Sequence, residues 1–289
     1  MLYIQNLPYE LKDIIKEYYI FKPLNSLELR KAIILWSKDN QEALNKYGHI
    51  SLWNTSLITD MSGLFCGQIN FNTNINDWDV SNVTNMEYMF NNCLTFNQPL
   101  NKWNTGKVIN MFSMFNNCNN FNQSLNEWDI SNCINIASMF SNCFQYNQEL
   151  NKWNTGKIIN MEGIFFNCFQ FNQPLNNWNT ENVLIMAFMF VNCIRFNQPL
   201  NNWNTENVIN MSRMFYRCYE FNQPLDNWNV SSVTSMDKMF IRSKSFNQRL
   251  CSWDVSSVIN MNNMFYGTSS LNRKYLQWYN FKSNDKNSI

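Results

Sequence analysis

A tryptophan recurs at every twenty-fifth residue of this chain, and this fixed period constrains the fold more than any other feature of the sequence. The members of the series are Trp53, Trp78, Trp103, Trp128, Trp153, Trp178, Trp203, Trp228, Trp253 and Trp278. Of the eleven tryptophans, Trp36 alone lies outside the series. A period of about 20–50 residues is typical of stacked repeats, each of which buries its apolar face only against its neighbours. The sequence therefore predicts an elongated stack rather than a globule built around an active site.

The repeat that runs from Trp78 to Asn101 predicts a short helix followed by a short strand. Its apolar residues recur at spacings of three and four, as on one face of an amphipathic helix. These residues are Val83, Met86, Met89, Phe90 and Cys93. The segment FNQPL, residues 96–100, predicts a short parallel strand stacked on its copies about 4.8 Å apart. Each turn of the stack is thus expected to be an α/β unit.

Two further sets of residues recur every 25 positions, so each set is expected to form a column along the stack. One column indicates a buried position for a small side chain, and the other indicates a ladder of polar side chains. The first holds Cys93, Cys118, Cys143, Cys168, Cys193 and Cys218, and continues as Ser243 and Thr268. A position that accepts Cys, Ser or Thr favours a small buried side chain, and the absence of any CxxC pair argues against a zinc or disulfide framework. The second column is an asparagine in every turn, from Asn72 to Asn272, whose amides are expected to hydrogen-bond along the stack.

The pattern W-[ND]-x-x-x-[VI]-x-x-M-x-x-M-F-x-x-C-x-x-F-N-Q-x-L-N, repeated from Trp53 through Trp278, resembles the BspA-like repeat of bacterial surface proteins, also known as DUF285. The FNQPL element is also similar to FNIP repeats. The BspA-like resemblance implies an α/β fold: a right-handed, leucine-rich-repeat-like solenoid of about nine 25-residue turns, each with a short helix and a short parallel strand. Proteins of that family serve as adhesion or protein-interaction surfaces, and some occur in large DNA viruses.

Residues 1–50 break the period, so we expect three regions: a helical N-terminal segment 1–50, a solenoid 51–278 and a polar C-terminal tail 279–289. Helices are predicted over residues 7–19, 27–36 and 42–47. The simplest interpretation is that these helices cap the apolar edge of the first turn. The residues Leu7, Pro8, Leu11, Ile14 and Ile15 also resemble the opening of an F-box. That resemblance implies docking on a Skp1-like adaptor, as in F-box repeat proteins of giant viruses.

Composition and charge narrow the function classes. The net charge of +1 provides no overall electrostatic attraction to nucleic acid or to an anionic membrane, so we expect neither as a partner. No signal-peptide pattern or membrane-length apolar run is found, which predicts an intracellular protein, in the host cytoplasm if it is viral. His49 is the single histidine and lies outside the repeats, and no phosphate-binding glycine loop occurs. We therefore expect no enzyme activity, no cofactor and no metal site.

Functional residues must be sought among those that depart from the period. A basic group is predicted to form a patch on the last third of the stack, because equivalent positions lie above one another. Its members are Arg195, Arg213, Arg217, Lys238, Arg242, Lys244 and Arg249. Arginine is frequent in binding interfaces, whereas intervening glutamates such as Glu206 favour a merely solvated face. The variable aromatics Tyr88, Phe112, Phe166 and Phe188 are either exposed contacts or packing residues.

The sequence thus favours a non-catalytic scaffold that binds one or more protein partners. One alternative is an F-box-type adaptor, in which the N-terminal helices bind a Skp1-like protein and the repeats recruit a ubiquitination substrate. The second alternative is a surface adhesin.

Overall fold

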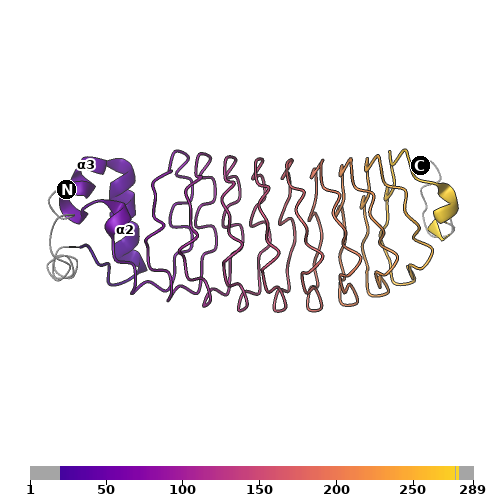
Figure 1. Ribbon diagram of the computed structural model, residues 1–289, viewed down its shortest axis with the longest axis horizontal. Coiled ribbons are helices and arrows are strands. Elements are labelled where there is room, and N and C mark those ends of the chain that lie inside the picture. Colours follow the sequence, from indigo (N-terminus) through magenta and orange to yellow (C-terminus); the bar gives the residue numbers. More distant parts are fainter. Residues whose placement is uncertain (1–19, 277, 280–289) are drawn as a thin grey trace.

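The computed structural model describes residues 20–276, 278 and 279. Four helical elements are present in this part: α2 (Ser26–Lys38), α3 (Asn40–Tyr47) and the 3-10 turns η1 (Ile50–Leu52) and η2 (Arg273–Tyr275). Between η1 and η2 the chain winds into a single row of 25-residue coils, with α2 and α3 at one end and η2 at the other (Figure 1). Every coil repeats the same backbone path, so side chains 25 residues apart lie in columns along the row.

The predicted α/β solenoid, with a helix and a strand in each turn, is wrong. The segment expected to be helical is a run of β-turns, in which the N–H of Met89 donates to Met86 O at 3.2 Å and that of Cys93 to Phe90 O at 2.9 Å. The third residues of these two turns, Tyr88 and Asn92, are left-handed, with φ of 55° and 61°. Successive turns of this kind place apolar side chains three residues apart, and this spacing mimics a helical period.

The remaining backbone groups of this segment bond to the next coil instead of to their own. The N–H groups of Met86, Tyr88 and Phe90 donate to carbonyls 24 residues later at 2.9 Å. Within the repeat region the described chain has no named strand, only isolated parallel bridges between equivalent residues of adjacent coils, such as Asn85 with Asn110. These bonds join each coil to its neighbours along the whole row.

The FNQPL segment is not a strand because asparagine side chains take the place of backbone partners. The N–H of Asn97 donates to Oδ1 of Asn72 at 2.9 Å, and the Nε2 of Gln98 donates to the same oxygen at 3.2 Å. The same pair of bonds recurs at Asn122 and Gln123. A side-chain amide therefore satisfies the backbone group that a parallel strand would have paired.

The core consists of aromatic columns. Phe90 and Phe96 stack within one coil at 4.2 Å between ring centroids, and Phe90 stacks on Phe115 of the next coil at 5.4 Å. Adjacent tryptophans stack as well, for example Trp103 on Trp128 at 6.0 Å. Nearly all of these rings are buried, so the stacked columns provide a continuous apolar interior.

The cysteine column is a set of buried hydrogen-bond donors. The thiol of Cys118 donates to Phe90 O at 3.1 Å, and the hydroxyl of Thr268 makes the equivalent bond to Phe240 O at 2.7 Å. All nine cysteines are free thiols. Desolvation raises the pKa of the Cys93 thiol to about 12 and holds that of Cys118 well above its usual range. The slot thus requires a small donor side chain, which explains why serine and threonine replace cysteine in the last coils.

Helix α2 covers the apolar edge of the first coil. Asn25 begins this helix by accepting the N–H of Glu28 at 3.0 Å, and its buried face carries Leu29, Ala32, Ile33 and Trp36. The ring of Trp36 packs edge-on against Trp53 at 6.1 Å, and the hydroxyl of Ser26 donates to Asp60 O at 2.6 Å. Helices α2 and α3 occupy slightly longer ranges than the predicted 27–36 and 42–47.

Some of the sequence predictions fall outside the described residues. The helix expected over residues 7–19 lies there, together with the proposed docking residues Leu7, Pro8, Leu11, Ile14 and Ile15. Of the predicted tail 279–289, the described part is Tyr279, whose buried ring packs edge-on against Phe265 at 5.2 Å.

Candidate functional site: a variable face on the later coils

Four positions in each coil differ from coil to coil, whereas the tryptophan, methionine and phenylalanine columns of the core stay nearly constant. We call their members in the four coils between residues 162 and 242 the variable face. These members are Glu162, Gly163, Phe166, Asn167, Ala187, Phe188, Val191, Asn192, Ser212, Arg213, Tyr216, Arg217, Asp237, Lys238, Ile241 and Arg242. The same positions of the first coil are Ser62, Gly63, Cys66 and Gly67. Aromatic residues stand at these positions in several coils, as at Tyr88 and Phe112, whereas basic residues are confined to the two adjacent coils of Arg213 and Lys238.

The β-turns present these positions on one side of the coil. Between Arg213 and Tyr216 the chain buries Met214 and Phe215, which are 0% exposed, and Cys218 follows in the core. The N–H of Arg213 donates to Asp237 O at 2.8 Å and that of Arg217 to Ile241 O at 2.7 Å, so equivalent residues of adjacent coils are held one above the other. The backbone of the face is therefore rigidly positioned.

Two of the four positions have a left-handed backbone. The φ angles are 56° at both Arg213 and Lys238, 58° at Arg217 and 55° at Arg242. Glycine and asparagine tolerate this conformation, whereas other L-residues lose about 1 kcal/mol or more in it. In the column of Arg217 and Arg242 every other coil places glycine or asparagine, whereas the column of Arg213 and Lys238 also holds tyrosine, serine and phenylalanine. Four of the seven predicted basic residues therefore occupy positions at which the backbone disfavours them.

An asparagine ladder follows one of these left-handed columns and ends at the variable face. Nδ2 of Asn167 donates to Oδ1 of Asn142 at 2.6 Å, and Nδ2 of Asn192 donates to Oδ1 of Asn167 at 2.6 Å. The next two members of the column are Arg217 and Arg242. The ladder is thus followed by arginines at two successive positions of the column.

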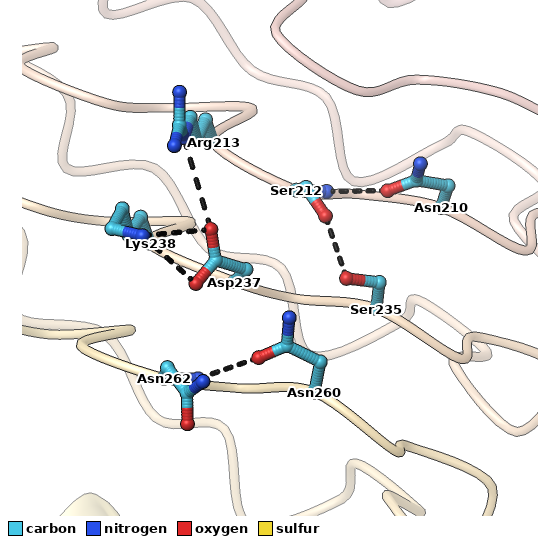
Figure 2. A network of polar contacts seen from close by, with 8 residues as sticks. All are labelled: Asn210, Ser212, Arg213, Ser235, Asp237, Lys238, Asn260 and Asn262. Carbon is cyan, nitrogen blue, oxygen red and sulfur yellow. Dashed lines mark hydrogen bonds and ion pairs between the residues drawn. The ribbon is translucent and has the colours of Figure 1, made fainter.

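A carboxylate lies between the two cations of the other left-handed column (Figure 2). Nζ of Lys238 is 3.2 Å from both oxygens of Asp237, and Nε of Arg213 is 3.8 Å from Oδ2. Figure 2 also shows a polar contact between neighbouring coils, in which the hydroxyl groups of Ser212 and Ser235 share a hydrogen bond of 2.7 Å. Asp237 therefore compensates the charges of Arg213 and Lys238.

A cavity of about 320 Å³ opens on the variable face. Its lining consists of Phe166, Phe188, Val191, Asn192, Arg213, Tyr216 and Lys238. The guanidinium of Arg213 lies 5.4 Å from the ring centroid of Phe188, and that of Arg217 lies 5.3 Å from the ring of Tyr216. The cavity thus combines aromatic walls with a cationic rim, a composition typical of binding hot spots.

The structure brings together only some of the predicted patch. Arg195, Lys244 and Arg249 belong to other columns, and the last two lie over Tyr219 and Tyr275 at 5.2 and 5.6 Å. Sequence reasoning named Phe166 and Phe188 but missed Tyr216 and Asp237. A comparison of each residue with its column mates would have singled out both.

The single histidine, His49, lies outside the coils. His49 packs edge-on against Trp36 at 5.1 Å and shares a hydrogen bond with Ser51, at the junction with the first coil. No group of three or more potential metal ligands occurs in the described chain. Both α2 and α3 fall short of the length and apolarity that a membrane crossing requires, and the described residues contain no further candidate span.

A family model matches the chain along its repeat region. The family model described as "Mycoplasma protein of unknown function, DUF285" matches the chain over residues 36–153, 134–232 and 200–288. These overlapping segments include all the coils and the whole variable face. No curated protein matches the chain.

Proposed function

The chain belongs to the DUF285 repeat family, and from this premise we propose that it is a non-catalytic protein-binding scaffold whose partner docks on the variable face. One observation carries the proposal: basic residues enter these four positions in two adjacent coils, beside the aromatic Phe188 and Tyr216, while the tryptophan, methionine and phenylalanine columns of the core keep their residues. Residues that vary within a column are not required by the fold. In stacked repeats, such positions are where binding specificity is placed.

The physical character of the face supports a protein partner. Tyr216 and Phe188 offer large apolar surfaces with little side-chain freedom to lose, and Arg213 and Arg217 offer forked donors beside them. A cavity of about 320 Å³ accommodates one large side chain of a partner. The hydrogen bonds between coils hold these residues in place before binding, which lowers the entropic cost of association.

Site-specific photocrosslinking tests the proposal. A benzoylphenylalanine is introduced at Phe188 or at Tyr216, and in a control at Glu206, which is exposed and outside the variable face. The full-length proteins are irradiated in extract of the cells that contain the natural protein. We expect the same discrete adduct from positions 188 and 216 and none from 206. Equal adducts at all three positions, or none at any, would overturn the proposal.

The adaptor function is a second candidate, favoured by an apolar strip on α2. Leu27 and Ile34 are seven residues apart on this helix and are 62% and 51% exposed, next to Leu24 at 72%. An F-box-type module would use such residues, together with Leu11 and Ile15, to bind a Skp1-like adaptor.

A direct binding measurement tests this candidate. Purified Skp1 is titrated into the full chain and into the variant Leu11→Asp/Ile15→Asp. Binding to the full chain that the variant loses supports the adaptor, and absence of binding to the full chain refutes it.

A further inference from the structure

We infer that Arg217 and Arg242 form an anion-binding pair which, with the adjoining cavity, selects a protein segment carrying an acidic side chain beside an aromatic or aliphatic one. This inference rests on the protein-binding function proposed above and specifies the chemistry of the partner. Four observations carry it: the backbone conformation at the pair, the uncompensated charge, the exposure of Arg242 and the position of Tyr216.

The first observation is that the backbone disfavours arginine at both positions. Asn92, Asn117, Asn142, Asn167 and Asn192 hold this column in the preceding coils. An asparagine at 217 would keep the favourable left-handed conformation and continue the amide ladder from Asn192, whose Nδ2 bonds to Asn167 at 2.6 Å. Residues held in a backbone conformation that their type disfavours are characteristic of functional positions.

The second observation is the electrostatic state of the pair. Within the described chain, no carboxylate lies within ion-pair distance of Arg217 or Arg242, whereas Arg213 and Lys238 share Asp237. The backbone bond from Arg217 N to Ile241 O, at 2.7 Å, holds the two arginines on adjacent coils. Nε of Arg217 is buried with no hydrogen-bond partner among the described residues. An anion bound at these two residues would neutralise their charge and supply acceptors to their N–H donors.

The third observation is the exposure of Arg242. The next member of the column is Gly267, with φ of 72°, and a Cβ at this position would lie only 3.1 Å from Cγ of Arg242. The coil that follows therefore places no side chain over Arg242, which is exposed. The guanidinium remains accessible to a ligand from the C-terminal side.

The fourth observation fixes the chemistry beside the anion. Tyr216 lines the cavity, and its ring also supports the guanidinium of Arg217 at 5.3 Å. The apolar cavity and the arginine pair thus share one residue. A ligand that fills both must carry an apolar side chain next to an anionic group, which a peptide with neighbouring acidic and aromatic or aliphatic residues does.

Peptide selection tests the inference. Random twelve-residue peptides displayed on phage are selected on the immobilised full-length protein, and affinities of the enriched peptides are measured by fluorescence anisotropy. We expect enrichment of Asp or Glu beside Phe, Trp, Tyr or Leu. Replacing the acidic residue of an enriched peptide by its amide should weaken binding at least about tenfold, since each charged hydrogen bond contributes strongly. A phosphoserine at the same place distinguishes a phosphate ligand from a carboxylate.

The variant Arg217→Asn/Arg242→Asn provides the decisive comparison, because asparagine is the natural residue of this column. We expect it to lose at least about tenfold in affinity for the acidic peptides while its Tm rises. The matched control is Lys107→Asn/Lys157→Asn, which removes the same charge from another column that also contains asparagine, as at Asn132. The control should bind the peptides as the wild type does.

The outcomes separate the two proposals. If peptides are selected but are not acidic, or if Arg217→Asn/Arg242→Asn binds them unchanged, the anion-binding inference fails while the protein-binding function stands. If no peptide is enriched and photocrosslinking yields no adduct, the protein-binding function itself fails. Binding of single-stranded poly-uridine that depends on Arg217 and Arg242 would replace the acidic segment by a nucleic acid and overturn the inference.

Discussion

The indole Nε1–H of Trp128 donates to the backbone carbonyl of Leu100 at 3.0 Å, across 28 residues of sequence. The same bond is made by every tryptophan from Trp78 to Trp278, each to the residue 28 positions earlier. The ring fills the apolar interior while its single donor satisfies a carbonyl of the preceding coil. Phenylalanine could provide the first property but not the second, which explains why tryptophan is retained at this position.

Replacing Trp128 by phenylalanine should therefore destabilise the protein. The change leaves Leu100 O without its partner in a buried site, and we expect a loss of about 1–3 kcal/mol in the free energy of unfolding, measured by urea denaturation. Trp278→Phe serves as the comparison, because Trp278 lies at the end of the row and is only half-buried. Equal losses at both positions would contradict the explanation.

The asparagine ladder of the FNQPL segments, for which the sequence predicted a strand, should be equally sensitive to substitution. Oδ1 of Asn147 accepts from the backbone N–H of Asn172 at 2.9 Å and from Nε2 of Gln173 at 3.1 Å. Asn147→Ala removes both bonds and should cost about 1–3 kcal/mol in urea denaturation. The neighbouring exposed Gln145→Ala should change stability by less than about 0.5 kcal/mol. A neutral result at Asn147 would show that water replaces the ladder without cost.

Tyr146 is a case in which substitution should stabilise. It occupies a column that holds phenylalanine in every other coil up to Phe246, and its buried hydroxyl has no hydrogen-bond partner among the described residues. Tyr146→Phe removes this desolvated group and keeps the ring stack with Phe121 and Phe171. We expect a gain of about 1–2 kcal/mol in the free energy of unfolding. A loss of stability would indicate that the hydroxyl is bonded in solution.

The pH dependence of stability should report the buried thiols. Desolvation raises the pKa of Cys93 from 9.0 to about 12, so above pH 9 the unfolded chain releases a proton that the folded chain retains. The stability contributed by the neutral thiol is therefore complete below pH 9 and is lost as the pH rises toward 12. Between pH 8 and 10.5 the wild type should lose about 1–2 kcal/mol more than Cys93→Ser, by urea denaturation at each pH. Parallel profiles of the two proteins would refute this assignment.

The left-handed backbone at Arg217 predicts a stabilising substitution at a functional position. Arg217→Asn relieves the conformational strain and offers Nδ2 to the ladder that ends at Asn192, so we expect a gain of about 0.5–1.5 kcal/mol in thermal or urea unfolding. The control Arg195→Asn lies in another, exposed column, and its effect should be near zero. If Arg217→Asn destabilises instead, the arginine has a structural role that its contacts do not reveal.

Much of the candidate site was accessible from the sequence, but its geometry was not. The residues Arg213, Arg217, Lys238 and Arg242 stand out because they break their columns, and any stack of repeats places them on adjacent coils. Their left-handed conformation, the pairing of Arg213 with Asp237 and the contact of Arg217 with Tyr216 depend on backbone angles that residue type does not encode. Arg195, Lys244 and Arg249 were grouped with them only because position around the coil could not be assigned.

The period itself, the constant columns and the resemblance to the DUF285 family were determined by the sequence alone, because side chains that stack on their own copies must recur at one spacing. The tertiary structure decided the backbone conformation of the segments between these columns. A helix and a run of β-turns both place apolar residues such as Met86 and Met89 on one side, so local spacing cannot distinguish the two. The choice is made by bonds such as that from Met86 N to Asn110 O, 2.9 Å long, whose partner exists only once the next coil is in place.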